Sequence, residues 1–232
     1  MLQALSGTGR LRDRSRHAAP QVFDVLRSKI VSLDLAPGTV LSRTELQDRF
    51  GLSSTPIRDA LLRLQEEGLV DIFPQSATVV SRIDLVQARQ AQFLRRSVEQ
   101  EVVRTLAAQR DRELVAALDT LIGEQQRVAR AGDFDRFAVA DEAFHRAMAE
   151  AAEVPDLWAL IRRRSGQIDR LRRLHLPVAG KMAQILDDHG AIVRAIEAGR
   201  PAEAEEALRS HLSRSLAFSS EMRLSHPDYF AE

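Results

Sequence analysis

The stretch Phe50–Val70, which reads FGLSSTPIRDALLRLQEEGLV, constrains the fold more than any other part of the chain. A short helix is predicted to end where this stretch begins, and Gly51 supplies the flexible corner that turns the chain. Ser53 or Ser54 can cap a new helix by accepting a bond from an unpaired backbone N–H, and Pro56 is tolerated in its first turn. The sequence therefore predicts a helix-turn-helix.

The second helix of this pair has two different faces. Four apolar residues recur at helical spacing and form a face that packs inward, namely Ile57, Ala60, Leu61 and Leu64. Thr55, Arg58, Asp59 and Arg63 point outward, and Gly68 ends the helix. A helix held by its back, with small polar groups and arginines in front, is how a helix-turn-helix protein reads DNA. The alternative is a helical hairpin that only packs within a core.

Further elements are predicted on both sides of this pair. His17–Leu33 has the pattern of an amphipathic helix, and a short helix from Arg43 to Phe50 precedes the turn. After the pair, Leu69–Phe73 and Thr78–Ser81 are predicted as two short strands joined by a four-residue loop. Such a hairpin would form a wing beside the helices.

Two segments of this region carry a family resemblance. Leu35–Ser42 (LAPGTVLS) and Leu46–Val70 resemble the winged-helix domain of the GntR family of bacterial transcription regulators, whose pattern is PG..L...L...F.VS..PVR.AL..L...GLV. The resemblance implies a double-stranded DNA operator as partner. It places the DNA contacts at Arg43, Thr44, Ser53, Ser54, Thr55, Arg58, Arg63 and, at the tip of the wing, Ala77.

The chain departs from the family pattern at two of these positions. Relatives usually carry glycine at the wing tip, where this chain has Ala77. Many relatives have Ser-Arg where this chain has Ser53-Ser54, so one arginine that contacts bases or phosphates is absent. We therefore do not carry over the operator sequence that the family favours.

Composition narrows the class of protein. The chain has 232 residues, enough for one large or two modest domains, and contains no cysteine, which excludes disulfides, thiolate zinc sites and cysteine nucleophiles. No apolar run is long enough to cross a membrane and no signal-peptide core is present, so we expect a cytoplasmic protein without a membrane partner. The net charge is +0, from 33 basic and 33 acidic residues, which predicts modest non-specific affinity for DNA.

The rest of the chain is predicted to be helical. Helices are expected from Asp84 to about Ala108 and at about 111–131, 133–151, 155–174, 178–198 and 201–224, separated by Gly- and Pro-containing breaks. The inner stripe of the first is predicted as Leu85, Ala88, Phe93, Leu94, Val98 and Val102. The fold class is thus mainly α, with an N-terminal winged helix-turn-helix and a C-terminal antiparallel bundle of six to seven helices.

This pattern divides the chain into four parts. Residues 17–82 are predicted to form the DNA-binding domain and residues 83–226 the helical domain. Residues 227–232 are predicted as a tail. Residues 1–16 contain four arginines and a single acidic residue, Asp13; the arginines are Arg10, Arg12, Arg14 and Arg16. This segment is predicted as a flexible basic tail or, alternatively, as an arm that meets DNA phosphates.

The predicted bundle carries a second chemical signal. Asp141 and His145 lie four residues apart and project from one face of a helix, while His189 and His211 occupy the last two helices. One carboxylate and three imidazoles facing one core make a site for a divalent transition metal. Taken separately, a histidine on a helix is usually hydrogen-bonded or at the surface, as we expect for His17, His175 and His226.

Three segments around these residues carry a second resemblance. They are Asp141–His145 (DEAFH), Asp188-His189 with Ile192, and Arg209–Leu212 (RSHL), and they resemble the metal-ligand segments of the FCD ligand-binding domain. This domain belongs to the FadR subfamily of GntR regulators. The resemblance implies that Asp141, His145, His189 and His211 hold a divalent metal, zinc above all, with nickel or manganese as alternatives.

Arginines are candidates for binding an effector. Arg95 and Arg96 lie in a segment, RRSVE, that is similar to an R..LE stretch of the family, of which one arginine often lines the pocket. Alternatively, both are solvated or pair with Glu99. The basic residues Arg162–Arg164, Arg170, Arg172 and Arg173 are predicted to form an exposed face or an interface rather than a binding site.

These observations predict a DNA-binding transcriptional regulator and not an enzyme. We expect a homodimer on a roughly palindromic operator, acting most simply as a repressor, with a small organic acid bound at the metal as effector. Two alternatives remain open at this point. One is a metal-dependent enzyme with an appended helix-turn-helix, and the other is a regulator in which the metal is purely structural.

Overall fold

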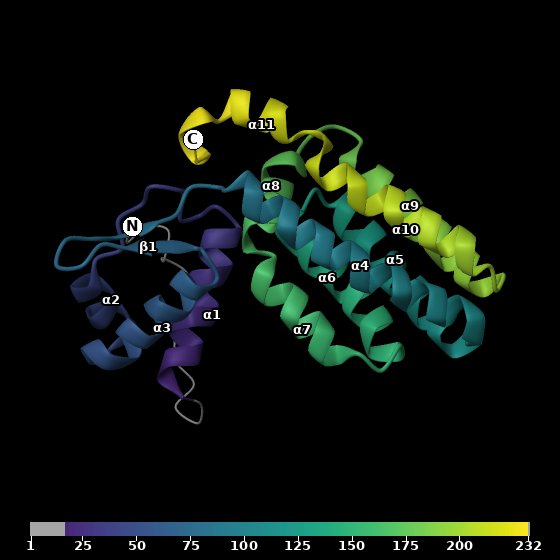
Figure 1. Ribbon diagram of the computed structural model, residues 1–232, viewed down its shortest axis with the longest axis horizontal. Helices are drawn as coiled ribbons and strands as arrows, with labels where there is room; N and C mark the ends of the chain where they lie inside the picture. The colour runs from purple at the N-terminus through teal and green to yellow at the C-terminus, as the bar shows by residue number, and fades with distance from the viewer. Residues whose placement is uncertain (1–16, 232) are drawn as a thin grey trace.

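A computed structural model of the chain describes residues 17–231, and in it two units lie side by side (Figure 1). The N-terminal unit comprises α1 (Ala18–Val31), α2 (Arg43–Phe50), α3 (Ser54–Glu66), β1 (Val70–Ile72) and β2 (Thr78–Val80). The helical unit comprises α4 (Leu85–Gln109), α5 (Arg112–Arg130), α6 (Phe134–Ala151), α7 (Pro155–Arg164), α8 (Gly166–His175), α9 (Lys181–Glu197), α10 (Pro201–Ala217) and α11 (Ser219–Ser225). The predicted basic tail, residues 1–16, lies outside the described residues.

The N-terminal unit is the predicted winged helix-turn-helix. Gly51 ends α2 in the left-handed conformation with φ 61°, which glycine adopts without steric cost. The inward faces of α1 to α3 share one core that contains Val22, Leu26, Ile30, Leu46, Ile57, Leu61 and Leu64. The hairpin β1–β2 is antiparallel, with Val70 opposite Val80. The predicted inner face of α3 is thereby confirmed.

The tip of the wing differs from the prediction. Ala77 does not lie at the tip, because its carbonyl accepts a hydrogen bond from the Phe73 N–H at 2.8 Å and closes the base of the loop. The left-handed residue of the loop is Gln75, with φ 57°. Glycine would adopt this left-handed conformation at a lower steric cost than Gln75 does.

The helical unit is the predicted antiparallel bundle (Figure 1). Its main core lies between α4, α5, α6, α9 and α10 and includes Val103, Leu106, Leu118, Phe144, Ile192, Ile196 and Leu208. The predicted inner stripe of α4 is partly wrong. Phe93 is 65% exposed, whereas Arg95 and Glu99 are buried. The helix turns these two charged residues inward, and they pair with each other there.

The predicted helix 155–174 is broken at Ser165. The Ser165 hydroxyl lies 3.0 Å from the Arg162 carbonyl and 2.7 Å from Asp169 Oδ2, the closer acceptor for its one proton, and α7 ends while α8 begins in a new direction. Gly166 then packs directly on Leu69 of the N-terminal unit, because a Cβ at Gly166 would lie 2.7 Å from Leu69 Cδ2. The break brings α8 against the winged helix.

Two other predicted helices are shorter than expected, since α9 begins only after Gly180 and the last one divides at Phe218.

The chain end also differs from the prediction. Residues 227–231, expected to form a tail, pack onto the junction between the two units. Ile83 donates its N–H to the Tyr229 carbonyl at 2.7 Å, and the Ala231 N–H donates to the Ile83 carbonyl at 3.0 Å. Phe230 is 3% exposed. The C-terminus consequently lies near the N-terminal unit rather than at the far end of the bundle (Figure 1).

Helix α8 joins the two units through buried polar contacts. Gln167 Nε2 donates to the Gly68 carbonyl at 2.7 Å, and Arg170 Nη1 donates to the Ser81 carbonyl at 2.6 Å. The sequence predicted an exposed face or an interface for Arg170, and the structure shows the second, since this side chain is completely buried at the contact between the two units. Burial without a carboxylate in contact lowers the pKa of Arg170 to about 10. The Ser81 and Arg82 carbonyl groups thus accept hydrogen bonds from the terminal nitrogens of a cation that belongs to the bundle, while its Nε has no hydrogen-bond partner.

Candidate metal centre

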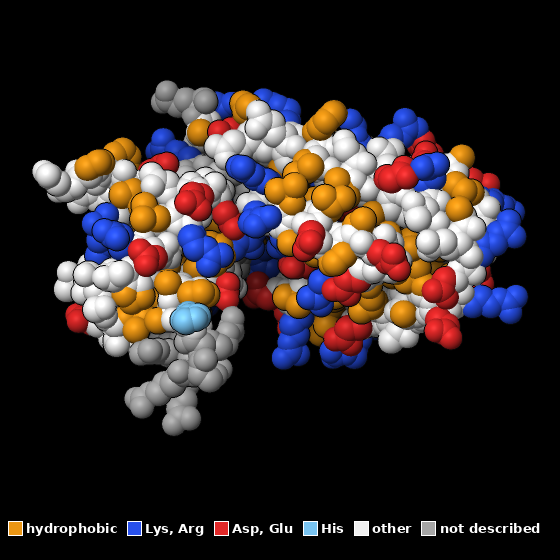
Figure 2. Space-filling model, turned by 60° about the horizontal axis from the view of Figure 1, so that its bottom comes forward, with side chains coloured by type: hydrophobic (Ala, Val, Ile, Leu, Met, Phe, Trp, Pro, Cys, Tyr) orange, Lys and Arg blue, Asp and Glu red, His pale blue; other side chains and the backbone are white. Residues whose placement is uncertain are grey.

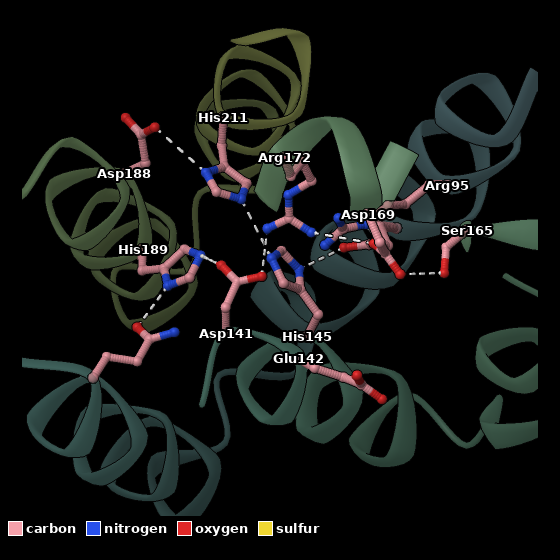
Figure 3. A network of polar contacts seen from close by, with 12 residues as sticks. Arg95, Asp141, Glu142, His145, Ser165, Asp169, Arg172, Asp188, His189 and His211 are labelled. Carbon is pink, nitrogen blue, oxygen red and sulfur yellow. Dashed lines mark hydrogen bonds and ion pairs between the residues drawn. The ribbon is translucent and has the colours of Figure 1, made fainter. Parts of the chain in front are cut away.

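Three helices of the bundle bring four ligand side chains together. Asp141 and His145 project from one face of α6, His189 from α9 and His211 from α10. All four are buried, and one ligand atom from each lies within 4.8 Å of the others. Figure 3 shows these side chains converging between the helices. The structure therefore assembles the set that the sequence singled out.

Neighbouring side chains orient the three imidazoles. Each Nδ1 faces an oxygen, which leaves Nε2 directed at the centre. The pairs are His145 with Glu99 at 2.6 Å, His189 with Gln125 at 2.8 Å, and His211 with Asp188 at 3.4 Å. The two inward atoms His145 Nε2 and His211 Nε2 are 3.3 Å apart. Such second partners fix the tautomer and ring orientation of metal-binding histidines.

Two atoms at the centre are buried without a hydrogen-bond partner. They are Asp141 Oδ1 and His189 Nε2, which lie 3.6 Å apart. Buried polar atoms are nearly always satisfied, so an unpartnered pair aimed at one point requires an explanation. A divalent cation held between them satisfies both atoms. On this observation, the residues present fit a transition-metal ion.

The protonation states at the centre also suit an ion. Burial, and then the positive charge of Arg95, lower the pKa of His145 to about 4. Burial lowers the pKa of His189 well below its usual range. Burial opposes ionisation of Asp141, but the positive charge of Arg172 opposes burial most strongly, and the pKa of this carboxyl lies well below its usual range. Neutral imidazoles and an ionised carboxylate are the forms that bind metals.

Arg172 on α8 contacts the carboxylate ligand directly. Its Nη2 donates to Asp141 Oδ2 at 2.5 Å, so the prediction that Arg172 belongs to an exposed face or an interface rather than to a binding site is wrong. Burial disfavours the charge on Arg172, but Asp141 and Asp169 outweigh it and raise the pKa of the guanidinium. One oxygen of Asp141 thus faces a cation of the protein, and the other faces the centre.

A cavity of about 540 Å³ opens onto this centre. Asp141, His211 and Arg172 line its inner part, and Lys181 also lines it. Helix α1 of the N-terminal unit supplies part of the wall as well. Figure 2 shows a hollow between the two units with blue basic side chains in its floor. The volume falls within the range of small-molecule pockets.

The two arginines singled out for effector binding lie in different places. Arg95 is buried, lines the cavity and pairs with Glu99, so the pairing that the sequence left as an alternative is present. Arg96 is not among the cavity-lining residues, and its guanidinium lies 5.8 Å from the centroid of the Phe93 ring. Only Arg95 can reach a molecule in the cavity.

Comparison with protein families decides what kind of protein this is. The model described as "Bacterial regulatory proteins, gntR family" matches residues 18–80, and the model described as "FCD domain" matches residues 90–214. The chain belongs to the GntR family of regulators and carries an FCD domain. It is a DNA-binding transcriptional regulator and not an enzyme, which settles the first alternative.

Relatives and solved structures agree with this assignment. A transcriptional regulator from an unstable DNA locus of Streptomyces ambofaciens is 34% identical over 90% of this chain and 88% of its own. The transcriptional repressor RspR of Escherichia coli is 28% identical over 91% of this chain and 93% of its own. The structure of Escherichia coli McbR covers 89% of this chain and 98% of its own with a TM-score of 0.75 at 21% identity, a likeness of fold.

The predicted DNA contacts of this GntR regulator lie mostly at the surface of the winged helix. Exposed side chains include Arg43 and Thr44 at the start of α2, and Ser53, Ser54, Thr55 and Arg58 at the start of α3. Arg63 is exposed, but its guanidinium lies over the Phe23 ring at 4.1 Å from the centroid. Ala77 is half-buried at the base of the wing loop.

Sequence reasoning missed several partners of the four candidate ligands in the FCD domain. Gln125 is completely buried on α5 among Leu118, Ile122 and Val128. A lone glutamine within an apolar helical stripe is a signal that could have found it. Asp188 directly precedes His189 in the motif, and its role at His211 depends on the packing of α9 against α10. His175, expected to be hydrogen-bonded or at the surface, is instead buried and stacks on Phe218.

Proposed function

We propose that this regulator is a repressor whose FCD domain binds a small organic acid at a divalent metal ion. The observation that carries the proposal is the buried cluster of three inward Nε2 atoms and the unpaired Asp141 Oδ1, which opens into the cavity. A purely structural ion would favour a closed, solvent-free sphere. The cavity at this centre favours a site that a ligand can enter.

Asp141, His145, His189 and His211 would hold the ion. A set of one carboxylate and three imidazoles suits zinc, nickel or manganese, and zinc is the first candidate because imidazole nitrogens, which suit zinc, make up three of the four ligands. Once bound, the ion supplies a positive charge with positions open to a carboxylate. The protein contributes orientation through Glu99, and a fixed cation through Arg172.

Basic groups in the cavity support an acidic effector. Arg95, Arg172 and Lys181 line the same space as the ligand cluster. Burial, and then the nearby Arg172, lower the pKa of Lys181. A bound carboxylate would relieve this repulsion and accept hydrogen bonds from these cations. We assign effector contacts to Arg95, and none to Arg96.

The winged helix, residues 17–82, would read DNA through the start of α3. Thr55 and Arg58 are exposed there and can reach base edges in the major groove, while Arg43 and Thr44 meet the backbone. We propose a homodimer through residues 83–226, so that two reading helices meet a roughly palindromic operator. The relatives named as repressors, RspR and a probable repressor of a D-xylose utilization operon, support repression.

The FCD domain also suggests the FadR subfamily. Over residues 17–231, no helix is both long and apolar enough to cross a membrane. Together with the relatives, this supports the cytoplasm, where the regulator would meet DNA.

Thermal melting against a panel of small carboxylates, before and after chelation, tests the function. A ligand of the folded state raises the melting temperature. We expect one acid to shift the curve in the metal-loaded protein, and the shift to vanish after chelation or in His189→Ala. His226→Ala, which alters an exposed histidine outside the cluster, should keep it.

Two results would count against the proposal. If chelation lowers stability but no acid shifts the curve, the ion is structural. If chelation changes nothing in a sample that held metal beforehand and none afterwards, the four residues do not form a significant ion site.

A further inference from the structure

Helices α7 and α8 lie between the ligand cluster and the winged helix and contact both. We propose that a chain of charged residues, linked through their side chains and through the Arg162 backbone carbonyl, transmits occupancy of the ion site to the C-terminal end of the reading helix α3. This inference rests on the proposed ion site. We call these residues the ionic chain, and in order they are Asp141, Arg172, Asp169, Arg162, Arg27 and Glu67.

The first link leaves the ligand cluster. Arg172 donates to Asp141 Oδ2 at 2.5 Å, and its Nη1 lies 3.8 Å from Asp169 Oδ1. The side chains of Asp141 and Asp169 are 4% and 9% exposed. Two carboxylates that are shielded from water thus share one guanidinium. A change of charge at the first alters the hold of the second on Arg172, because water screens charges weakly where both carboxylates are this little exposed.

The second link crosses the break between α7 and α8. Asp169 Oδ2 accepts from Arg162 Nη1 at 2.9 Å and from the Ser165 hydroxyl at 2.7 Å. Arg162 also pairs with Glu142, the neighbour of Asp141 on α6, at 2.9 Å. The turn between α7 and α8 is therefore held by Asp169, the same carboxylate that shares Arg172 with Asp141.

The third link reaches the DNA-binding unit. Arg27 on α1 donates its Nη2 to the Arg162 carbonyl at 2.7 Å and its Nε to Glu67 Oε2 at 2.7 Å. Glu67 is the C-cap residue of α3, and its own N–H bonds the Arg63 carbonyl. The ionic chain thus ends on the last turn of the reading helix.

Ion binding gives this chain a direction of response. A divalent ion on Asp141 neutralises the carboxylate and weakens its attraction for Arg172. The Arg172 guanidinium then pairs more strongly with its remaining partner, Asp169. Because Asp169 is now engaged by Arg172, its interaction with Arg162 weakens. The broken turn loosens, Arg27 loses its fixed carbonyl partner, and the last turn of α3 opens more often.

Hydrogen exchange of the full-length protein tests this inference, with zinc alone as the probe. In the wild type, zinc should slow exchange in α6, α9 and α10 and speed it at least about fivefold in residues 64–67. Opposite signs in the two regions distinguish transmission from general stabilisation. In Arg27→Gln, zinc should still slow the bundle but leave residues 64–67 unchanged.

A matched control lies on the same helix. Lys29 also lines the cavity, but it pairs with Asp34 of its own unit at 2.8 Å, so Lys29→Gln should respond like the wild type. If Arg27→Gln does not fold, Glu67→Gln breaks the same link from its other end. The inference is overturned if zinc slows hydrogen exchange at residues 64–67 of the wild type or leaves it unchanged. It is also overturned if zinc speeds this exchange as much in Arg27→Gln as in Lys29→Gln. If zinc leaves even the bundle unchanged, the ion site itself is wrong.

Discussion

Gln125 Oε1 lies 2.8 Å from Nδ1 of His189, and both side chains are completely buried. An amide oxygen can only accept a hydrogen bond, so at this distance the His189 Nδ1 carries the proton and donates it. The Nε2 atom is then unprotonated, and its lone pair faces Asp141. One amide on α5 thereby decides which nitrogen of α9 is available to an ion.

Replacing Gln125 with methionine should weaken zinc binding about 10- to 100-fold, because His189 loses the acceptor that fixes its tautomer. Competition with a chromogenic chelator measures the affinity. Gln126→Met, one residue further along α5 and exposed, should bind zinc like the wild type. Equal affinities in the two variants would show that Gln125 only fills space.

Glu99→Gln should destabilise the metal-free protein by about 3 kcal/mol, since it leaves the buried Arg95 without its counter-charge. Urea denaturation measures the loss. Glu101→Gln on the same helix removes an exposed partner of Arg104 and should leave the midpoint unchanged. A neutral result for Glu99→Gln would mean that water reaches Arg95.

The metal-free protein should lose stability as the pH falls from about 6.5 to about 4. The pKa of His145 is about 4 in the folded state and 6.5 ordinarily, so the unfolded chain takes up the proton first. This histidine alone contributes a loss on the order of 3 kcal/mol. The pKa of Glu99, at about 2 where Arg95 and His145 outweigh its burial, extends the loss below pH 4.5.

Denaturation of the chelated protein at several pH values checks this dependence. His145→Gln should unfold with a shallower pH dependence between pH 6.5 and 4. An equally steep curve in that variant would assign the effect to other groups.

Arg58→Ala should reduce affinity for operator DNA by about tenfold or more, because it removes a cation from the exposed start of α3. DNA selected by the protein from a random pool serves as the operator in a fluorescence titration. The melting temperature should not change. Gln65→Ala, exposed at the other end of α3, should bind like the wild type, and loss of binding in both variants would indicate a damaged helix.

Two glycine substitutions should have opposite effects. Gly166→Ala places a methyl group 2.7 Å from Leu69 and should cost about 1 to 3 kcal/mol at the contact between the units. Gly123→Ala meets nothing within 4 Å on α5 and should stabilise the protein by about 0.5 to 1 kcal/mol. Thermal melting of both variants measures the difference. A stabilised Gly166→Ala would mean that α8 is free to move away from Leu69.

The faces of single helices could be predicted from the sequence. Apolar spacing located the inner face of α3, and spacing with a family resemblance singled out the residues that the structure gathers at the metal centre. Buried charges could not be predicted in this way, because Arg95 and Glu99 look polar in any pattern and become compatible with burial only as a pair. Arg170 and Arg172 are buried for the same reason, by partners on other elements.

The break at Ser165 was beyond the sequence pattern as well. No proline or glycine precedes it, and Gly166 follows only where the turn already exists. The direction of α8 is set by its contacts with Leu69 and Gly68, which lie about a hundred residues away along the chain. Local propensity carries no information about such contacts.

The docking of Phe230 beside Ile83 places residues 227–231 on the segment that leads from the winged helix into α4. Ile83 gives both its N–H and its carbonyl to this docked segment. The winged helix therefore cannot swivel about Ile83 without breaking two backbone hydrogen bonds and exposing the Phe230 ring to water.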